Sequence, residues 1–133
     1  MSWEIYVQDF PNDIESLSEV PENFEPKSIG KTEQLKTLIK ERFDVIDDNG
    51  CLSVEKENEW SIVVRIGEQE VCKSIMIEVR GNTIEAVETL RGILLTLNYR
   101  AVDMMTGEFV DQKLLERSAK DFKRYVSQII RGS

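Results

Sequence analysis

The chain has no histidine among its 133 residues, which removes the side chain that most often acts as a general base or a metal ligand. A serine or cysteine nucleophile that relies on a histidine partner is therefore excluded. Cys51 and Cys72, the two cysteines, are too few to form a zinc site without histidine. We interpret both as buried, reduced thiols, and the sequence predicts no catalytic residue, no metal site and no cofactor.

Two short motifs nevertheless contain residue types that could do chemistry. Gly30-Lys31-Thr32 has the lysine and hydroxyl of a phosphate-binding loop, but such a loop needs another glycine five residues earlier, where this chain has Glu25. Asp103, Glu108 and Asp111 surround a predicted hairpin turn and could bind a cation or exchange protons. Because their spacing does not fit an EF-hand loop, we interpret them as a solvated hairpin tip.

A third group of residues suits protein recognition rather than catalysis. Tyr6 and three arginines occupy positions that point away from the hydrophobic side of their predicted strands. Aromatic and guanidinium groups are enriched in protein interfaces, so this side of the sheet fits a binding surface if no helix covers it; otherwise Tyr6 belongs to the core. With two acids of the predicted hairpin added, the candidate partner-binding residues are Tyr6, Arg65, Arg80, Arg100, Asp103 and Glu108.

The charge of the chain is unevenly distributed. Seventeen bases and 25 acids give a net charge of −8, and residues 1–60 hold 15 acids and 6 bases. The first 26 residues hold seven acids and no base. Such a chain is poorly suited to nucleic acid, whose phosphates are neutralised by Lys and Arg. The acidic half can steer a basic protein partner, or it can simply keep the protein soluble.

The overall composition, 41% hydrophobic and 32% charged, is typical of one globular domain. No apolar run is long enough to cross a bilayer. Residues 1–10 carry acids where a signal peptide needs bases. We therefore expect a cytoplasmic protein without a membrane partner.

Alternating apolar and polar residues predict six strands. In the first strand, Trp3, Ile5 and Val7 share one side. The predicted ranges are 3–8, 51–56, 60–66, 71–80, 100–104 and 108–110. Short links between the second, third and fourth strands favour an antiparallel meander, which Asp47-Asp48-Asn49-Gly50 precedes as a turn. Residues 11–30 have no clear period and hold all three prolines, which indicates an ordered segment laid over the domain.

Apolar residues that recur every three or four positions predict helices over 31–43, 82–98 and 112–130. In the second helix we expect Asn82 to be the N-cap and Glu85 its capping-box partner. The resulting order is β-α-β-β-β-α-β-(β)-α. It predicts an α+β fold, with an antiparallel sheet of about five to six strands and helices mainly on one face.

The predicted last helix combines a narrow apolar seam with a basic stripe on the opposite side. The seam consists of Leu115, Ala119, Phe122, Val126 and Ile129. The stripe consists of Lys113, Arg117, Lys120, Arg124 and Arg131. The seam can pack on its own domain, or it can pair with a second copy, because steps of three and four also build coiled coils. A third alternative is contact of the basic stripe with nucleic acid or a membrane, which the acidity of the rest of the chain disfavours. We therefore separate an α+β domain over 1–111 from an amphipathic helix over 112–133 through which a homodimer could form. Its last three residues, 131–133, have the character of an expression tag.

Motifs spread over residues 3–111 resemble a family of small bacterial proteins of unknown function. They are Trp-Glu-Ile-Tyr-Val-Gln-Asp-Phe-Pro at 3–11, Phe24-Glu25-Pro26, Ile29-Gly30, Ala101-Val102-Asp103 and Thr106-Gly107-Glu108-Phe109. The resemblance implies no assigned chemistry. Some small acidic bacterial proteins of this kind act as immunity partners of toxins, which provides an analogy.

We therefore expect a non-enzymatic cytosolic binding protein, with an immunity-type inhibitor of a basic protein as its most specific form. One alternative is a structural or oligomer-forming component that assembles through the last helix. Another is a small enzyme that works through carboxylates or arginine without histidine.

Overall fold

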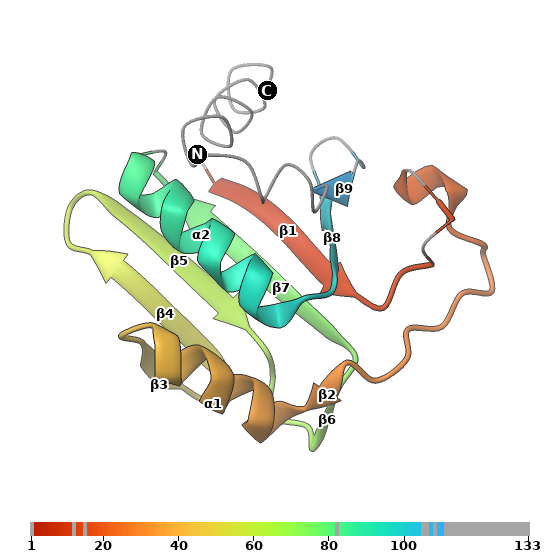
Figure 1. Ribbon diagram of the computed structural model, residues 1–133, viewed down its shortest axis with the longest axis horizontal. Helices are drawn as coiled ribbons and strands as arrows, with labels where there is room; N and C mark the ends of the chain where they lie inside the picture. The colour runs from red at the N-terminus through yellow and green to blue at the C-terminus, as the bar shows by residue number, and fades with distance from the viewer. Residues whose placement is uncertain are drawn as a thin grey trace.

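A seven-stranded sheet forms the centre of the computed structural model, which describes residues 2–11, 13–14, 16–81, 83–104, 107 and 109–110 (Figure 1). Its strand order is β3-β4-β5-β7-β1-β8-β9, and every neighbouring pair is antiparallel. The strands are β1 (Ser2–Gln8), β3 (Ile46–Asp48), β4 (Cys51–Lys56), β5 (Trp60–Arg65), β7 (Ser74–Arg80), β8 (Arg100–Asp103) and β9 (Phe109–Val110). A separate two-stranded sheet pairs β2 (Gly30–Lys31) with β6 (Val71–Cys72).

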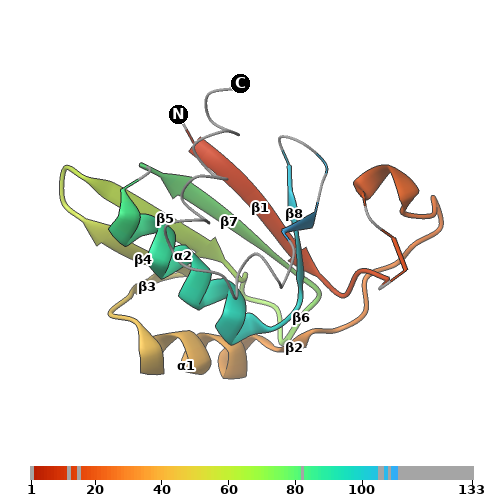
Figure 2. The ribbon, with the colours of Figure 1, turned by 45° about the horizontal axis from the view of Figure 1, so that its top comes forward.

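Two α-helices, α1 (Thr32–Arg42) and α2 (Ile84–Leu97), lie on the same face of the large sheet (Figures 1 and 2). A single-turn 3-10 helix, η1 (Leu17–Glu19), lies in the segment between β1 and β2. We call the helix-covered side of the sheet the inner face and the opposite side the outer face. The α+β class and the antiparallel sheet are therefore confirmed, and the sheet has more strands than the sequence predicts.

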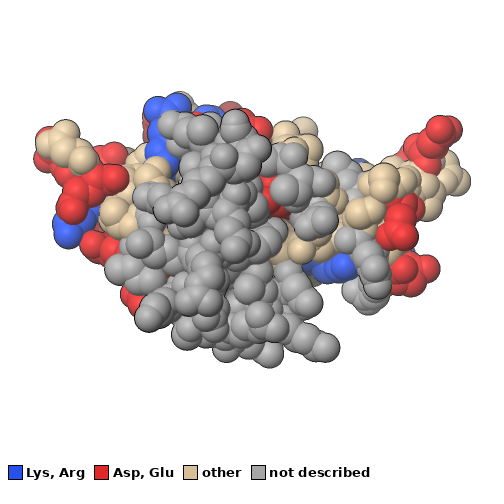
Figure 3. Space-filling model, turned by 90° about the horizontal axis from the view of Figure 1, so that it is seen from above, with Lys and Arg blue, Asp and Glu red and all other residues tan. Residues whose placement is uncertain are grey.

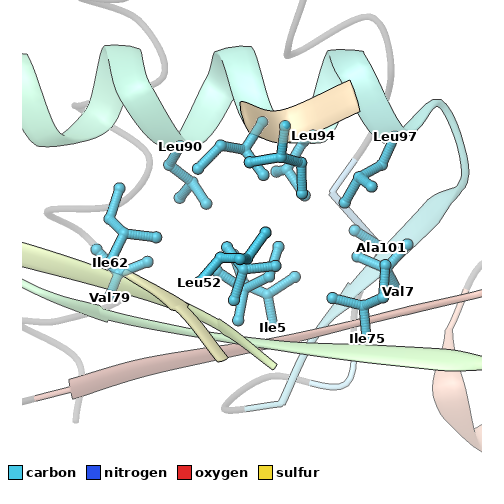
Figure 4. Packing of buried hydrophobic residues seen from close by; sticks show 14 of the residues in the cluster. Ile5, Val7, Leu52, Ile62, Ile75, Val79, Leu90, Leu94, Leu97 and Ala101 are labelled. Carbon is cyan, nitrogen blue, oxygen red and sulfur yellow. The ribbon is translucent and has the colours of Figure 1, made fainter. Parts of the chain in front are cut away.

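The core lies between α2 and the inner face of the sheet. Trp3, Ile5 and Val7 are buried there as the period-two pattern predicts. Figure 4 shows Leu90 and Leu94 of α2 directed toward the apolar side chains of the strands. Each such side chain contributes about 1.5–3 kcal/mol through its removal from water, so this layer supplies most of the driving force that holds the helix on the sheet.

Two strand predictions need correction. Asp47 and Asp48 were expected in a turn, but they belong to β3, and the turn consists only of Asn49 and Gly50. Both of these residues have positive φ, at 50° and 87°, as the Asn-Gly pair of a two-residue hairpin requires. The predicted strand over 71–80 is interrupted at Lys73, because β6 pairs with β2 whereas β7 enters the large sheet.

The capping prediction for α2 is also wrong. The N-cap is Thr83, whose hydroxyl oxygen accepts a hydrogen bond from the backbone N–H of Ala86 at 3.2 Å. Glu85 is therefore not in the capping-box position, and its carboxylate pairs with Lys56 at 3.2 Å instead. At the other end Asn98 adopts the left-handed conformation and stops the helix, as expected.

The predicted last helix over 112–130, its seam, its basic stripe and the boundary at residue 111 lie outside the described residues. Neither of the described α-helices has the length and apolar character that crossing a bilayer requires.

Candidate protein-binding surface

Tyr6 and Arg65 lie in the same row of residues across the outer face. Strand pairing places Met76 opposite Tyr6 on one side and opposite Arg65 on the other, so the three side chains are neighbours. Both described α-helices lie on the inner face (Figure 2). Tyr6 is half-buried and Arg65 is exposed. The structure thus brings together two of the predicted recognition residues, on the face where they were expected.

Arg65 and Arg80 are joined through one carboxylate. The Nη2 atom of Arg65 lies 3.8 Å from Glu78, and the Nε atom of Arg80 donates to the other oxygen of Glu78 at 3.1 Å. The side chain of Glu78 is only 14% exposed, whereas that of Arg80 is 71% exposed. Part of the positive charge on this face is therefore balanced within the sheet, and Arg80 keeps most of its surface available.

Arg100 has a different environment from the other two arginines. It is half-buried, and its guanidinium donates to the backbone carbonyl of Pro11 and, at 2.9 Å, to that of Ile14. The same guanidinium lies 3.9 Å above the centre of the Phe109 ring. Arg100 therefore ties the segment after β1 to β8 and β9, and its donors point into the protein rather than toward a partner.

We call residues 9–28 the N-terminal meander; Figure 1 shows this segment extending beyond the β9 edge of the sheet. Three aromatic rings attach it to the sheet. Phe10 stacks on Phe24 with ring centres 6.0 Å apart, and its ring meets that of Phe109 edge-on at 5.1 Å. Phe10 is also buried. Arg100 and the aromatic cluster hold the start of the meander against β8 and β9, and Phe24 joins them through Phe10. These contacts fit the predicted ordered segment, but it extends beyond the sheet edge instead of lying over the domain.

The exposed charged side chains of the meander are acidic except for Lys27. Asp13, Glu19, Glu22 and Glu25 are exposed. Among the residues that the structure describes, Asp13, Glu22 and Glu25 take part in no ion pair. Figure 3 shows acidic side chains at this end of the molecule and again at the opposite end, near the hairpin that joins β4 and β5.

The carboxylates predicted around the β8–β9 hairpin do not form a solvated group. Asp103 is 0% exposed, and strand pairing places it opposite Ile5 on the inner face. The interpretation of this residue as part of a solvated tip is therefore wrong, and in this conformation it offers no surface to a partner. Glu108 and Asp111 lie outside the described residues.

The Gly30-Lys31-Thr32 motif lies where β2 leads into α1. Gly30 and Lys31 form β2, and the hydroxyl of Thr32 donates to the carbonyl of Gln69, so these residues start α1 and link it to the loop before β6. Within the described ranges no three His, Cys, Asp or Glu side chains are grouped closely enough to hold a metal ion.

Both thiols are free, as predicted, but the prediction that both are buried holds only for Cys72. Cys72 is buried, and its Sγ atom lies 3.3 Å from the carbonyl oxygen of Ser74. Burial raises the pKa of the Cys72 thiol, and the hydrogen bond with the Ser74 backbone offsets part of that rise. Cys51 is half-buried on the outer face, with Nη1 of Arg65 at 3.6 Å.

The attachment of the meander is the feature that sequence reasoning missed. The two carbonyl acceptors of Arg100 lie 89 and 86 positions before it in the chain. A local pattern cannot indicate such a pairing. The only available signal was that hydrophobic residues recur between the prolines of residues 11–30, which indicates an ordered segment without naming what it contacts.

Comparison with known proteins adds no relative. No protein-family model, no curated protein and no solved structure matches this chain.

Proposed function

We propose that the chain is a non-enzymatic binding protein that recognises a basic surface of a protein partner through its acidic N-terminal half. The observation that carries this proposal is the meander, whose carboxylates face outward from a segment held in place by Arg100 and by stacked phenylalanines.

Attachment matters because a binding segment that is already ordered loses little conformational entropy when it binds. A disordered acidic tail would attract cations without a defined shape. The meander instead presents Asp13, Glu22 and Glu25 from a backbone that Arg100 and Phe10 hold at its start and that leads into β2 at its end. Such an arrangement favours specificity and a fast, charge-steered encounter with a basic protein.

The most specific form of this proposal is an immunity-type inhibitor of a basic protein. It is supported by the acidic charge, and the immunity role itself comes from an analogy with some small acidic bacterial proteins. Oligomer formation through residues 112–130 is a second proposal that rests on the seam pattern alone.

The proposal is tested with two variants that remove the same charge from different places. The meander variant carries Asp13→Asn, Glu22→Gln and Glu25→Gln. The control variant carries Glu57→Gln, Glu68→Gln and Glu70→Gln, which are also exposed and, within the described ranges, outside any ion pair.

Each immobilised protein is used to capture partners from a lysate of the source organism, and the affinity of a purified captured protein is then measured between 50 and 500 mM salt, a range of roughly tenfold in ionic strength. We expect binding to weaken as salt rises, and to be lost in the meander variant but kept in the control. Recognition by the meander would be refuted if the affinity of the partner does not change with salt, or if the partner binds both variants with equal affinity.

A further inference from the structure

The strand β3 forms one edge of the large sheet. It pairs with β4 alone among the described strands. The two-residue hairpin makes Asp48 and Cys51 a hydrogen-bonded pair, and Ile46 and Ser53 form the next such pair. The N–H and C=O groups of Asp47, which lies between them, therefore point away from the sheet. An open edge of this kind is a template for another strand.

The side chains around this edge are accessible. All three residues of β3 are exposed, and Ile46 is 62% exposed, more than any other large hydrophobic residue of the described part. Ile46 and Asp48 project on the outer face. The carboxylate of Asp47 projects on the inner face, where Nζ of Lys40 donates to it at 2.7 Å. This hydrogen bond lowers the pKa of Asp47.

The charge near β3 indicates what kind of strand fits. Asp44 and Asp48 are exposed, and neither forms an ion pair with a described residue. A second copy of β3 would bring carboxylates against carboxylates, which destabilises a strand pair. An extended segment that alternates lysine with β-branched residues would instead place its lysines on the outer face, where their ammonium groups pair with Asp48 and their alkyl stems cover Ile46.

We propose that the β3 edge binds an extended basic segment of the partner as an eighth strand of the sheet. The proposal shares with the proposed function a basic protein partner, but it places the contact at the opposite end of the sheet from the meander. Backbone hydrogen bonds to Asp47 would give affinity, and the side chains of Ile46 and Asp48 would give selectivity.

The probe is a capped eight-residue peptide of alternating valine and lysine, titrated into the ¹⁵N-labelled full chain. We expect amide shifts centred on residues 46–48 and slower hydrogen exchange of the Asp47 amide. The same peptide with an N-methyl group on every residue has no backbone N–H to donate from either edge, and it should bind at least tenfold more weakly. Equal affinity of the two peptides would overturn the proposal.

A pair of variants separates the backbone from the side chain. Asp47→Pro and Asp47→Ala both lose the carboxylate that binds Lys40, but only proline also loses the outward N–H. Proline is tolerated where the N–H of an edge strand faces solvent, and thermal unfolding of both variants verifies this. We expect Asp47→Pro to bind the unmethylated peptide at least tenfold more weakly than Asp47→Ala.

The location of the peptide distinguishes this proposal from the proposed function. Shifts confined to residues 13–25 would overturn strand addition and leave recognition by the meander intact. Binding at residues 46–48 that N-methylation weakens would support strand addition. If, in addition, the captured partner binds the meander variant as tightly as the wild type, the meander is refuted as the recognition surface.

Discussion

Replacing Arg100 by methionine should release the N-terminal meander while the sheet stays folded. The substitution removes two hydrogen bonds from the guanidinium, to the carbonyl groups of Pro11 and Ile14, and its contact with the Phe109 ring. Methionine keeps most of the apolar stem of the side chain, so packing beneath the guanidinium changes little.

The magnitude of the effect follows from these contacts. Hydrogen bonds from a charged donor contribute about 1.5–3 kcal/mol each, and a cation–π contact contributes about 0.5–1 kcal/mol. Removing the half-buried guanidinium also removes the free-energy cost of its desolvation. We therefore expect the free energy that holds the meander on the sheet to fall by about 2–4 kcal/mol. At 1.36 kcal/mol per factor of ten, the open state becomes about 30- to 900-fold more populated.

A glutamate-specific protease measures this opening directly, because the meander contains Glu19, Glu22 and Glu25. When reclosing is faster than cleavage, the cleavage rate follows the population of the open state. Arg100→Met should therefore be cut in the meander at least 30-fold faster than the wild type, by the same conversion. Its main thermal transition should change little, because the core lies between α2 and the sheet.

Arg80→Met is the matched control, since it replaces the same residue type on the same face of the sheet. Its side chain is 71% exposed and bonds only to Glu78 among the described residues. The control should be cut in the meander at the wild-type rate. If Arg100→Met is cut no faster than Arg80→Met, Arg100 does not hold the meander, and the premise of a preorganised acidic surface is wrong.

Further predictions concern the turns, the thiols and the last helix. Gly50→Ala should destabilise the protein by more than about 4 kcal/mol, in the range of severe substitutions, because its Cβ would lie 2.4 Å from the carbonyl oxygen of Gly67 at a φ of +87°. Gly67→Ala, at a φ of +93° with no atom within 4 Å, should cost only about 1–2 kcal/mol of left-handed backbone strain; equal losses in urea unfolding would contradict the clash. Thiol titration should label Cys51 in the native protein and Cys72 only after unfolding, because Cys72 is buried with a raised pKa. A disulfide between them would refute this. If the seam of residues 112–130 pairs two copies, Phe122→Ala should shift the mass measured by light scattering from dimer to monomer. A wild type that stays monomeric at high concentration would exclude that dimer.

Local patterns in the sequence predicted most of the elements and their buried sides. Trp3, Ile5 and Val7 alternate with polar residues and are buried as expected. The Asn49-Gly50 pair adopts the positive φ values of a hairpin turn. Such features depend on residues that are neighbours in the chain, so the sequence by itself determines them.

Finer boundaries depended on interactions that a local pattern does not contain. Thr83 rather than Asn82 caps α2, although both residue types accept the required hydrogen bond. The strand predicted over 71–80 divides at Lys73, because its first part pairs with β2. At Lys73 the choice between two locally acceptable conformations was made by a neighbouring element, the strand β2.

Only the tertiary structure decided which distant residues meet. β1 enters the sheet between β7 and β8, and this places Tyr6 beside Met76 and Val102, and Asp103 beside Ile5 in the buried layer. The same arrangement brings Arg100 to the carbonyl groups of the meander. Sequence periodicity indicates which side of a strand is apolar. The strand order and the register, which determine these contacts, depend on the packing of the whole sheet.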